Sequence, residues 1–375
     1  MSFLARLFGT ERSGLSGALE LDLKRLKAVA TSMGEGNASL GLKNLSPADQ
    51  LHRLNRYLGD CLGSCSALER TVIQEKIASA DRILPAELRT AKSSSLSPEA
   101  QNAIANGCAD LGQALSDEQV QSIHAHLKSK HVLLCHDAHI SSTAVPSLGD
   151  VPADQNYACY EYLDLWSSPH ILENATQDRI LDLAQAYLGC TPTLYSINAF
   201  WSFPNRQPHP YSQLFHRDWE DYRSLVVFTL LTPVWSPEEG AHYYVATSHD
   251  VKMFERSLNA RGVASADDES LSGRDGEVIA PVAMRLFEHG ARCFDGPAGQ
   301  SFCGDGYGLH RAVVPRSRPR LLLWFRFGNF YNETMYKLPL RGAARAEAQR
   351  ALQRIPDTPR HRYVFRYIVN ALSAV

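Results

Sequence analysis

The sequence has no stretch of about 18 apolar residues, no C-x-x-C pair, no internal repeat and no excess of charge of either sign. The first absence argues against a membrane-spanning helix, and the apolar run at the N-terminus is too short for a signal peptide. With 38 Lys and Arg against 40 Asp and Glu, the chain lacks the positive field that nucleic acid demands. We therefore expect a cytoplasmic protein whose main partner is neither a membrane nor a nucleic acid.

The eight cysteines are scattered along the chain, so a disulfide framework or a zinc ribbon is not expected. Cys61 and Cys65 lie four residues apart on a predicted helix and could share one face. Without a second pair of ligands, they are more simply explained as small buried apolar residues. Reduced thiols fit this pattern.

The composition indicates an ordinary globular protein, because 44% of the 375 residues are hydrophobic and 21% are charged. A chain of this length predicts a domain of catalytic size with an appendage. From about residue 14 to 112, apolar residues recur at spacings of three and four, and helix-cap signals occur at Ser46, Ser66 and Ser97. We therefore divide the chain into an N-terminal all-helical region, 1–112, and a second domain, 113–375.

The second domain begins with helical patterns at 116–127 and 176–188, the latter ending at Gly189. The pattern then changes to short segments rich in β-branched and aromatic residues and separated by Gly, Pro and Asp. These segments are 193–203, 224–234, 242–246, 291–294, 301–303 and 321–330. Many short strands after helices predict an α+β fold with a β-sandwich or barrel.

The sharpest local signal is the triplet His216-Arg217-Asp218, directly before the apolar run that begins at Leu225. On a strand, residues i and i+2 point to one side, so His216 and Asp218 can offer a nitrogen and an oxygen to one ion. They would form two-thirds of the 2-His-1-carboxylate triad of non-haem Fe(II) oxygenases. Roughly 0.8 such triplets are expected by chance in this composition, so the context must decide.

His310 is the favoured third ligand. It follows a glycine-rich segment, G-D-G-Y-G-L-H, and precedes a strand, and closure of a barrel would bring it near the first pair. His242, His249 and His289 are competing candidates, although a surface or hydrogen-bonded role is the simpler explanation for His242 and His249.

Arg320 begins the apolar strand L-L-L-W-F, ten residues after His310. An unpaired charge buried there is expensive, and an anionic cosubstrate would account for it. Arg320 could bind the distal carboxylate of a 2-oxo acid bidentately. Arg316 and Arg318 are rivals in the same turn, and a solvated basic turn without a ligand is the alternative explanation.

Three segments together resemble the phytanoyl-CoA dioxygenase-like family of Fe(II)/2-oxoglutarate-dependent oxygenases. They are S-Q-L-F-H-R-D at 212–218, the stretch from 240 that ends in T-S-H-D, and H-R-A-V-V-P at 310–315 leading to Arg320. The similarity spans about residues 115–332. It implies a double-stranded β-helix, a jelly-roll or cupin-like barrel flanked by helices, with iron bound by His216, Asp218 and His310 and 2-oxoglutarate bound by Arg320.

The resemblance also suggests residues around the cosubstrate. Asn198 matches a region where the family places a further cosubstrate contact, and Trp235 would line the pocket. Trp219 is another pocket candidate, although large residues on strands are more often part of the core. Ala312 stands where some members carry a hydroxyl residue, so that contact is expected to be missing. The N-terminal helical region matches nothing associated with the family.

The implied reaction consumes 2-oxoglutarate and O2, releases succinate and CO2, and hydroxylates an aliphatic C–H of a small-molecule substrate. Related halogenases lack the carboxylate ligand, so Asp218 favours hydroxylation. A metal-binding cupin-like enzyme that does not use 2-oxoglutarate and an inactive barrel that acts as a binding module remain open. The polar stretch 256–274 is a lid candidate or an insertion. The helical region is expected to cover the barrel or form a homodimer, with a partner-binding or gating role as the alternative.

Overall fold

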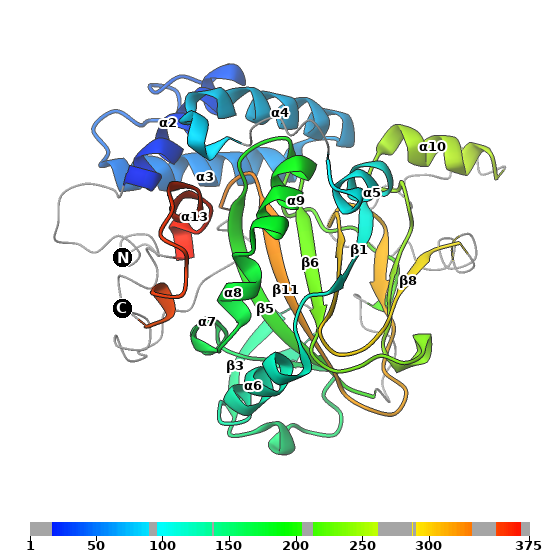
Figure 1. The fold of residues 1–375 in the computed structure, drawn as a ribbon. Coiled ribbons are helices and arrows are strands. Elements are labelled where there is room, and N and C mark those ends of the chain that lie inside the picture. The colour runs from blue at the N-terminus through cyan, green and yellow to red at the C-terminus, as the bar shows by residue number, and fades with distance from the viewer. Residues whose placement is uncertain are drawn as a thin grey trace.

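The computed structural model describes residues 17–89, 96–136, 139–204, 213–261, 287, 290–331 and 350–368 (Figure 1). The helices are α2 (Gly17–Ser32), α3 (Pro47–Ser64), α4 (Ala67–Ala80), α5 (Pro98–Asn106), α6 (Asp117–Leu127), α7 (Tyr162–Ser167), α8 (Ile171–Ala175), α9 (Asp178–Leu188), α10 (Val251–Asn259) and α13 (Pro359–Val364). Short 3-10 turns are η1 (Asp81–Ile83), η2 (Ala86–Leu88), η3 (Leu148–Asp150) and η5 (Pro237–Glu239). The strands are β1 (Cys108–Gln113), β2 (Val132–His136), β3 (His139–Val145), β4 (Tyr157–Cys159), β5 (Thr193–Ser202), β6 (Leu225–Leu230), β7 (His242–Tyr244), β8 (Arg292–Phe294), β9 (Gln300–Gly304), β10 (His310–Ala312) and β11 (Arg320–Gly328).

The predicted helix starts are confirmed by their hydrogen bonds. The side chains of Ser46, Ser66 and Ser97 each accept a bond from a backbone N–H in the first turn, and Ser66 forms a reciprocal capping box with Glu69. Gly189 ends α9 in the left-handed conformation, at φ 72°, which a residue with a side chain adopts at a cost.

The larger sheet contains eight described strands in the order β1-β9-β6-β11-β5-β4-β2-β3, and its pairs are antiparallel. At its centre, β11 pairs with both β5 and β6. Alternate side chains of β11 point to opposite faces, because the period of a strand is two. Leu321, Leu323 and Phe325 belong to the main core, and α7, α8 and α9 cover that face of the sheet (Figure 1).

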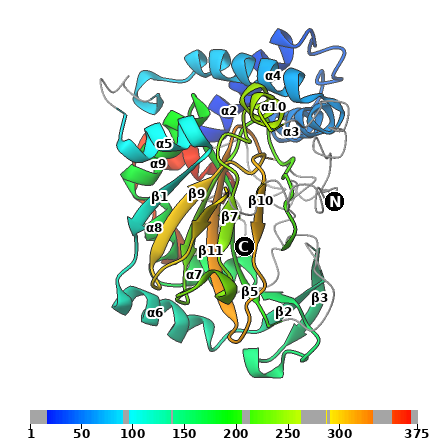
Figure 2. The same cartoon turned by 90° about the vertical axis from the view of Figure 1, so that its right-hand side faces the viewer.

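The smaller sheet has the order β10-β7-β8 and packs on the opposite face of the larger one (Figure 2). From β6 onward, the chain passes back and forth between the two sheets. The strand β6 lies in the larger sheet, β7 and β8 in the smaller, β9 in the larger, β10 in the smaller and β11 in the larger. Phe294 of β8 stacks on Phe302 of β9 with ring centroids 4.6 Å apart. Aromatic side chains therefore fill part of the space between the sheets.

Residues 108–112 form most of β1, although the sequence pattern placed them in the helical region. The helix α5 ends at Gly107, which has a φ of 77°, and the chain then pairs with β9 at the edge of the larger sheet. The short sequence C-A-D-L-G-Q contains too few apolar residues to be recognised as a strand. The strands β2, β3 and β4 were also not predicted, although β2 has the apolar run V-L-L-C.

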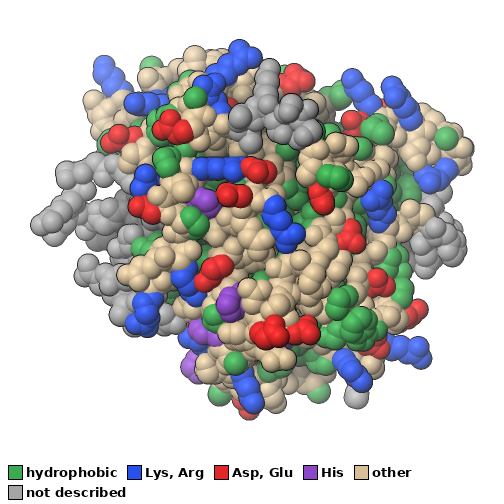
Figure 3. Space-filling view, viewed as in Figure 1, with side chains coloured by type: hydrophobic (Ala, Val, Ile, Leu, Met, Phe, Trp, Pro, Cys, Tyr) green, Lys and Arg blue, Asp and Glu red, His purple; other side chains and the backbone are tan. Residues whose placement is uncertain are grey.

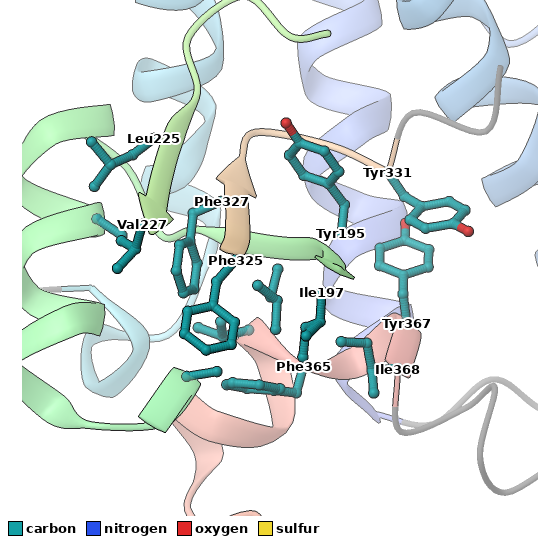
Figure 4. Close-up of a cluster of buried hydrophobic side chains, with 14 of the residues drawn as sticks. Tyr195, Ile197, Leu225, Val227, Phe325, Phe327, Tyr331, Phe365, Tyr367 and Ile368 are labelled. Carbon is teal, nitrogen blue, oxygen red and sulfur yellow. The ribbon is translucent and has the colours of Figure 1, made fainter. Parts of the chain in front are cut away.

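The helices α2, α3 and α4 lie across one end of the larger sheet and share its hydrophobic core (Figures 1 and 2). Figure 4 shows where they meet: Tyr331 stacks on Tyr367 at 4.6 Å, beside Phe365 and Ile368 from the C-terminal part of the chain. One cluster of buried side chains runs from α2 through the sheet to α13. The helical layer therefore shares the main core, and a small second cluster of Leu84, Leu88 and Tyr363 lies beside it.

Buried charges also join this layer to the sheet. Arg366 donates to Asp22 of α2 at 2.9 Å and to Thr193 of β5 at 2.6 Å, and both members of the ion pair have no exposed side-chain surface. The hydroxyls of Tyr363 and Tyr367 donate to the same carboxylate. Because buried charges need their partners, this network fixes α2 to one position on the sheet.

Basic and acidic side chains are interspersed over the face shown in Figure 3, in keeping with the balanced net charge. In the part of the chain that the structure describes, every helix is too short or too polar to cross a bilayer. All eight cysteines are free thiols.

The Arg366→Met substitution should reduce the free energy of unfolding by about 3 kcal/mol, because it leaves the buried carboxylate of Asp22 without its closest cation. Urea unfolding followed by circular dichroism measures this. The matched control is Arg362→Met, which removes an ion pair to Asp357 whose side chains are 54% and 82% exposed. The control should change stability by less than about 1 kcal/mol. Equal effects of the two substitutions would contradict a structural role for the buried pair.

Candidate metal centre

His216, Asp218 and His310 meet between the two sheets. The backbones of His216 and His310 pair as an antiparallel bridge, with N–H···O distances of 3.0 and 3.1 Å in the two directions. The N–H of Asp218 donates to the carbonyl of Gly306 at 2.8 Å. Two segments that are distant in the sequence are therefore held together by backbone hydrogen bonds, and the three side chains project to one side.

Both imidazoles are oriented in the same way. The Nδ1 atom of His216 is 2.8 Å from the carbonyl oxygen of Leu214, and that of His310 is 2.8 Å from the carbonyl oxygen of Gly308. A carbonyl can only accept, so Nδ1 carries the hydrogen and Nε2 presents its lone pair. Each Nε2 lies 3.7 Å from an oxygen of Asp218, and the ligand atoms lie within 4.8 Å of one another.

The protonation states suit metal binding. Burial lowers the pKa of His216 to about 4, with a further contribution from the His310 ring, so its imidazole is neutral at pH 7. Burial opposes ionisation of Asp218, but the His310 and His216 rings and Arg326 hold the pKa of this carboxyl below its usual value. Two imidazoles bonded through Nδ1 and one carboxylate are a donor set that fits a divalent cation such as Fe(II).

Glycines before His310 permit the close packing of this segment. A Cβ atom on Gly308 would lie 1.7 Å from the hydroxyl oxygen of Tyr244, and one on Gly306 would lie 3.4 Å from the Cβ of Asp218. Tyr244 is buried and has no room to withdraw. The glycine-rich segment thus lets the backbone approach its neighbours closely.

Two of the competing histidines, His242 and His249, lie outside this cluster. His242 is buried beside it, with its ring centroid 5.5 Å from that of His310, and it packs against Phe228 and Phe302. His249 lies 3.3 Å from the carbonyl oxygen of Ile104 through Nε2. His289 lies outside the described residues. Among the residues that the structure describes, the His216, Asp218 and His310 group is the one identified as able to hold a metal, and Cys61 and Cys65 have no further ligands to join them.

Arg320 is buried between the sheets, and Arg316 and Arg318 are exposed. Arg320 donates through Nη1 to the carbonyl of Gly240 and through Nη2 to the hydroxyl of Ser202 at 3.0 Å. None of the ion pairs found among the described residues includes this guanidinium, and burial lowers its pKa to about 10.

The ligand cluster and Arg320 face the same interior. Burial lowers the pKa of His242 well below its usual value, and the nearby His310 and the Arg320 cation lower it further. The geometry agrees, because Arg320 donates to the carbonyl of Gly240, two residues before His242, and the His242 ring lies 5.5 Å from that of His310. Asn198, 4% exposed, lies opposite Trp324 on the neighbouring strand and donates to Ser196.

The two tryptophans named as pocket candidates have different environments. Trp235 is 71% exposed, so its side chain lies on the surface, and its place at the pocket stays a prediction. It stands just after the end of β6, in a turn that faces water. Trp219 is half-buried and contacts Tyr307 edge-on, with ring centroids 5.1 Å apart.

The sequence analysis missed Arg326 and Glu220. The Nη2 atom of Arg326 lies 3.7 Å from the Oδ2 of Asp218, and its Nε lies 2.9 Å from Glu220. Its guanidinium also lies 5.3 Å from the ring of Trp324. The sequence contains a signal for Arg326, which is a charge in the middle of the apolar strand L-L-L-W-F-R-F. Like Arg320, a buried charge at this position needs a partner, because leaving it unpaired is expensive.

Comparison with known proteins gives distant likenesses. No family model matches the chain. No curated protein matches it either. Among solved structures, the non-haem α-ketoglutarate-dependent epimerase SnoN from nogalamycin biosynthesis has 16% sequence identity and a TM-score of 0.42, over 66% of this chain and 88% of that one. The carbocyclase SnoK from the same biosynthesis has 15% identity and a TM-score of 0.41, over 65% and 89%. EvdO2 from Micromonospora carbonacea var. aurantiaca, complexed with 2-oxoglutarate, has 17% identity and a TM-score of 0.39, over 63% and 91%. Likenesses this distant do not assign the chain to a family.

The His310→Ala substitution should weaken binding of Co(II) by more than about 100-fold. Loss of a residue that only orients a ligand typically weakens metal binding by about 10- to 100-fold, and loss of the ligand itself should have a larger effect. Isothermal titration calorimetry with purified protein measures this. The control is His249→Ala, which should bind Co(II) like the unsubstituted protein. If the control loses the metal instead, the third ligand has been assigned wrongly.

The Gly308→Ala substitution should lower the free energy of unfolding by about 1–3 kcal/mol and weaken Co(II) binding, since the new methyl group displaces Tyr244 or the strand that carries His310. Thermal unfolding and the same titration test both effects. Gly63→Ala is the control, because a methyl group at that position would have no neighbouring atom within 4 Å. A Gly308→Ala protein with unchanged stability would contradict the close packing.

Proposed function

We propose that the protein is an Fe(II)- and 2-oxoglutarate-dependent oxygenase that hydroxylates an aliphatic C–H of a small molecule. The observation that carries this proposal is a buried cation, Arg320, on the same face of β11 as Arg326, which contacts Asp218 of a 2-His-1-carboxylate cluster. The cluster alone would suit several metal enzymes. The cation adds a requirement for an anionic ligand beside the metal, which a 2-oxo acid with two carboxylates meets.

Arg320 supports the choice of cosubstrate through its hydrogen bonds. It donates to one carbonyl and one hydroxyl, and these neutral acceptors leave its charge uncompensated. A carboxylate would form charge-assisted bonds with the guanidinium and restore the pKa that burial has lowered. Asn198 and Ser202 lie four residues apart on β5 and face the same side, so Asn198 is a second polar contact for the cosubstrate.

His216, Asp218 and His310 would hold iron through the two Nε2 atoms and one carboxylate oxygen. When bound, iron and 2-oxoglutarate supply the oxidising chemistry that releases succinate and CO2. The carbonyls of Leu214 and Gly308 fix the two rings, so neither has to reorient when metal arrives. Arg326, itself held by Glu220, restrains the carboxylate of Asp218.

Aromatic side chains around the interior would keep water away from the reaction. Phe200 stacks on Trp324 at 4.8 Å, and Phe228 stacks on Phe302 at 4.9 Å. All four side chains belong to strands of the larger sheet. Exclusion of water strengthens the charge interactions that hold a dianion and protects an oxidising site from side reactions.

The strand order supports the finer structural proposal. Strands that alternate between two antiparallel sheets are the arrangement that a double-stranded β-helix would have, and His310 begins β10 and pairs there with His216. We further propose that the protein is related to the phytanoyl-CoA dioxygenase-like oxygenases, because the motifs around His216 and His310 resemble theirs. The lid candidate falls partly outside the described residues, and its described part, up to residue 261, includes the end of helix α10.

Purified protein supplied with Fe(II), 2-oxoglutarate and O2 should release succinate, and Arg320→Gln should weaken 2-oxoglutarate binding by about 10- to 100-fold. This follows because a hydrogen bond to a charged group contributes about 1.5–3 kcal/mol and each 1.4 kcal/mol is tenfold. The measurements are succinate formation by mass spectrometry and anaerobic titration of 2-oxoglutarate into the Co(II)-loaded protein.

Arg316→Gln is the matched control, because this arginine lies four residues away in an exposed turn. It should leave 2-oxoglutarate binding unchanged. Metal binding without binding of the oxoacid would replace the proposal with a cupin-like enzyme that uses another reaction. Absence of both kinds of binding would leave a barrel that acts as a binding module.

A further inference from the structure

The buried face of helix α4 includes two polar side chains, Arg70 and Gln74, next to Ile77 and Ala80. Arg70 and Gln74, one turn apart, are each 6% exposed, and Leu68 and Val72 are 60% and 51% exposed. A surface helix ordinarily buries its apolar residues and exposes its polar ones. The inward-facing polar residues of α4 therefore need a reason in what they contact.

Arg70 contacts both segments that carry the metal ligands. Its Nε donates to the backbone carbonyl of Asp221 at 3.1 Å, three residues after Asp218. Its guanidinium lies 4.0 Å from the ring centroid of Tyr307, three residues before His310. Its Nη2 lies 3.9 Å from the carboxylate of Asp305 in the same segment.

These two segments are already joined to each other at the site, because the N–H of Asp218 donates to the carbonyl of Gly306. Arg70 lies beside this joint and contacts the chain on both sides of it. Tyr307 is held on a second side by Arg217, whose guanidinium lies 4.6 Å from the ring and whose Nη1 donates to the Tyr307 carbonyl at 2.6 Å. The ring is thus fixed between an arginine of the helical layer and an arginine of the ligand segment.

Gln74 extends the same contact. It exchanges two hydrogen bonds with the side chain of Asn329, at 2.7 and 3.1 Å. Asn329 in turn donates to the carboxylate of Asp221 from its backbone at 2.6 Å and from its amide at 2.8 Å. Both buried polar residues of α4 are therefore linked to Asp221. Arg70 donates to its backbone carbonyl, and Gln74 is linked to its carboxylate through Asn329.

We propose that Arg70 is a positioning residue for the metal centre, and that helix α4 of the N-terminal region thereby supports the site. The inference rests on the proposed metal site. Arg70 holds the Asp221 and Tyr307 segments at the separation at which Asp218 and His310 face one ion. The helical layer then contributes to metal affinity without contacting the metal.

The test compares Arg70→Met with Arg366→Met in the full chain. Both arginines are buried and both join the helical layer to the sheet, but the contacts identified for Arg366 among the described residues are with Asp22, Thr193, Tyr363 and Tyr367. Mn(II) affinity is measured by electron paramagnetic resonance of free Mn(II), at a temperature at which each protein is folded. Arg70→Met should weaken Mn(II) binding by about tenfold, the lower end of the effect of groups that orient ligands. Arg366→Met should lose stability and keep the affinity.

Arg70→Lys provides a second measurement if the methionine variant does not fold. A lysine keeps the charge but cannot both donate to Asp221 and stack on Tyr307, so the affinity should again fall. An Mn(II) affinity equal to that of the unsubstituted protein in a folded Arg70 variant overturns the inference. Equal weakening by Arg366→Met also overturns it, because the effect would then reflect general loss of stability. If the unsubstituted protein binds no Mn(II), the metal site itself fails, and the proposed function fails with it.

Discussion

The antiparallel pairing of His216 with His310 is the contact on which the candidate site depends. Directly opposed residues of an antiparallel pair project to the same face, so two backbone hydrogen bonds suffice to bring the two imidazoles together. Asp218 follows two residues later and therefore joins the same side. The pairing places the His216 segment beside β10, at the edge of the smaller sheet. The site therefore depends on this segment reaching that edge.

The helical layer is held to the sheet by charges as well as by apolar packing. Apolar contacts are not directional, and a helix held by them alone has several similar positions available. Arg25 and Arg366 share Asp22, and Arg70 reaches the backbone of Asp221, so each contact accepts only one geometry. Removal of one partner from such a pair leaves a buried charge. These contacts give the helical layer a defined position above the segments that carry the metal ligands. A layer that only covered the sheet with apolar side chains would not need such a position.

The sequence predicted the parts of the molecule whose signal is local. Serine caps marked the starts of α3, α4 and α5, and the triplet at His216 with the glycines before His310 led to the three clustered side chains. It could not place β1, because C-A-D-L-G-Q has little apolar pattern and gains its partner only when β9 lies beside it. It could not decide how far Trp235 is exposed, because a residue after a strand end faces whichever side the turn selects. The contacts of Arg70 join positions more than a hundred residues apart, and no local pattern encodes them.

The charges around the interior suggest why metal and oxoacid would bind together. Among the described residues that face it, Asp218 and Glu220 oppose Arg326 and Arg320, and burial keeps His216 neutral because its pKa is about 4. The two carboxylates and two guanidiniums sum to zero. A divalent cation alone would leave two positive charges in surroundings of low dielectric, and a dianionic oxoacid alone would leave two negative ones. A divalent cation and a dianionic oxoacid together add no net charge, so binding of one should favour binding of the other. The oxoacid also supplies Arg320 with a carboxylate partner.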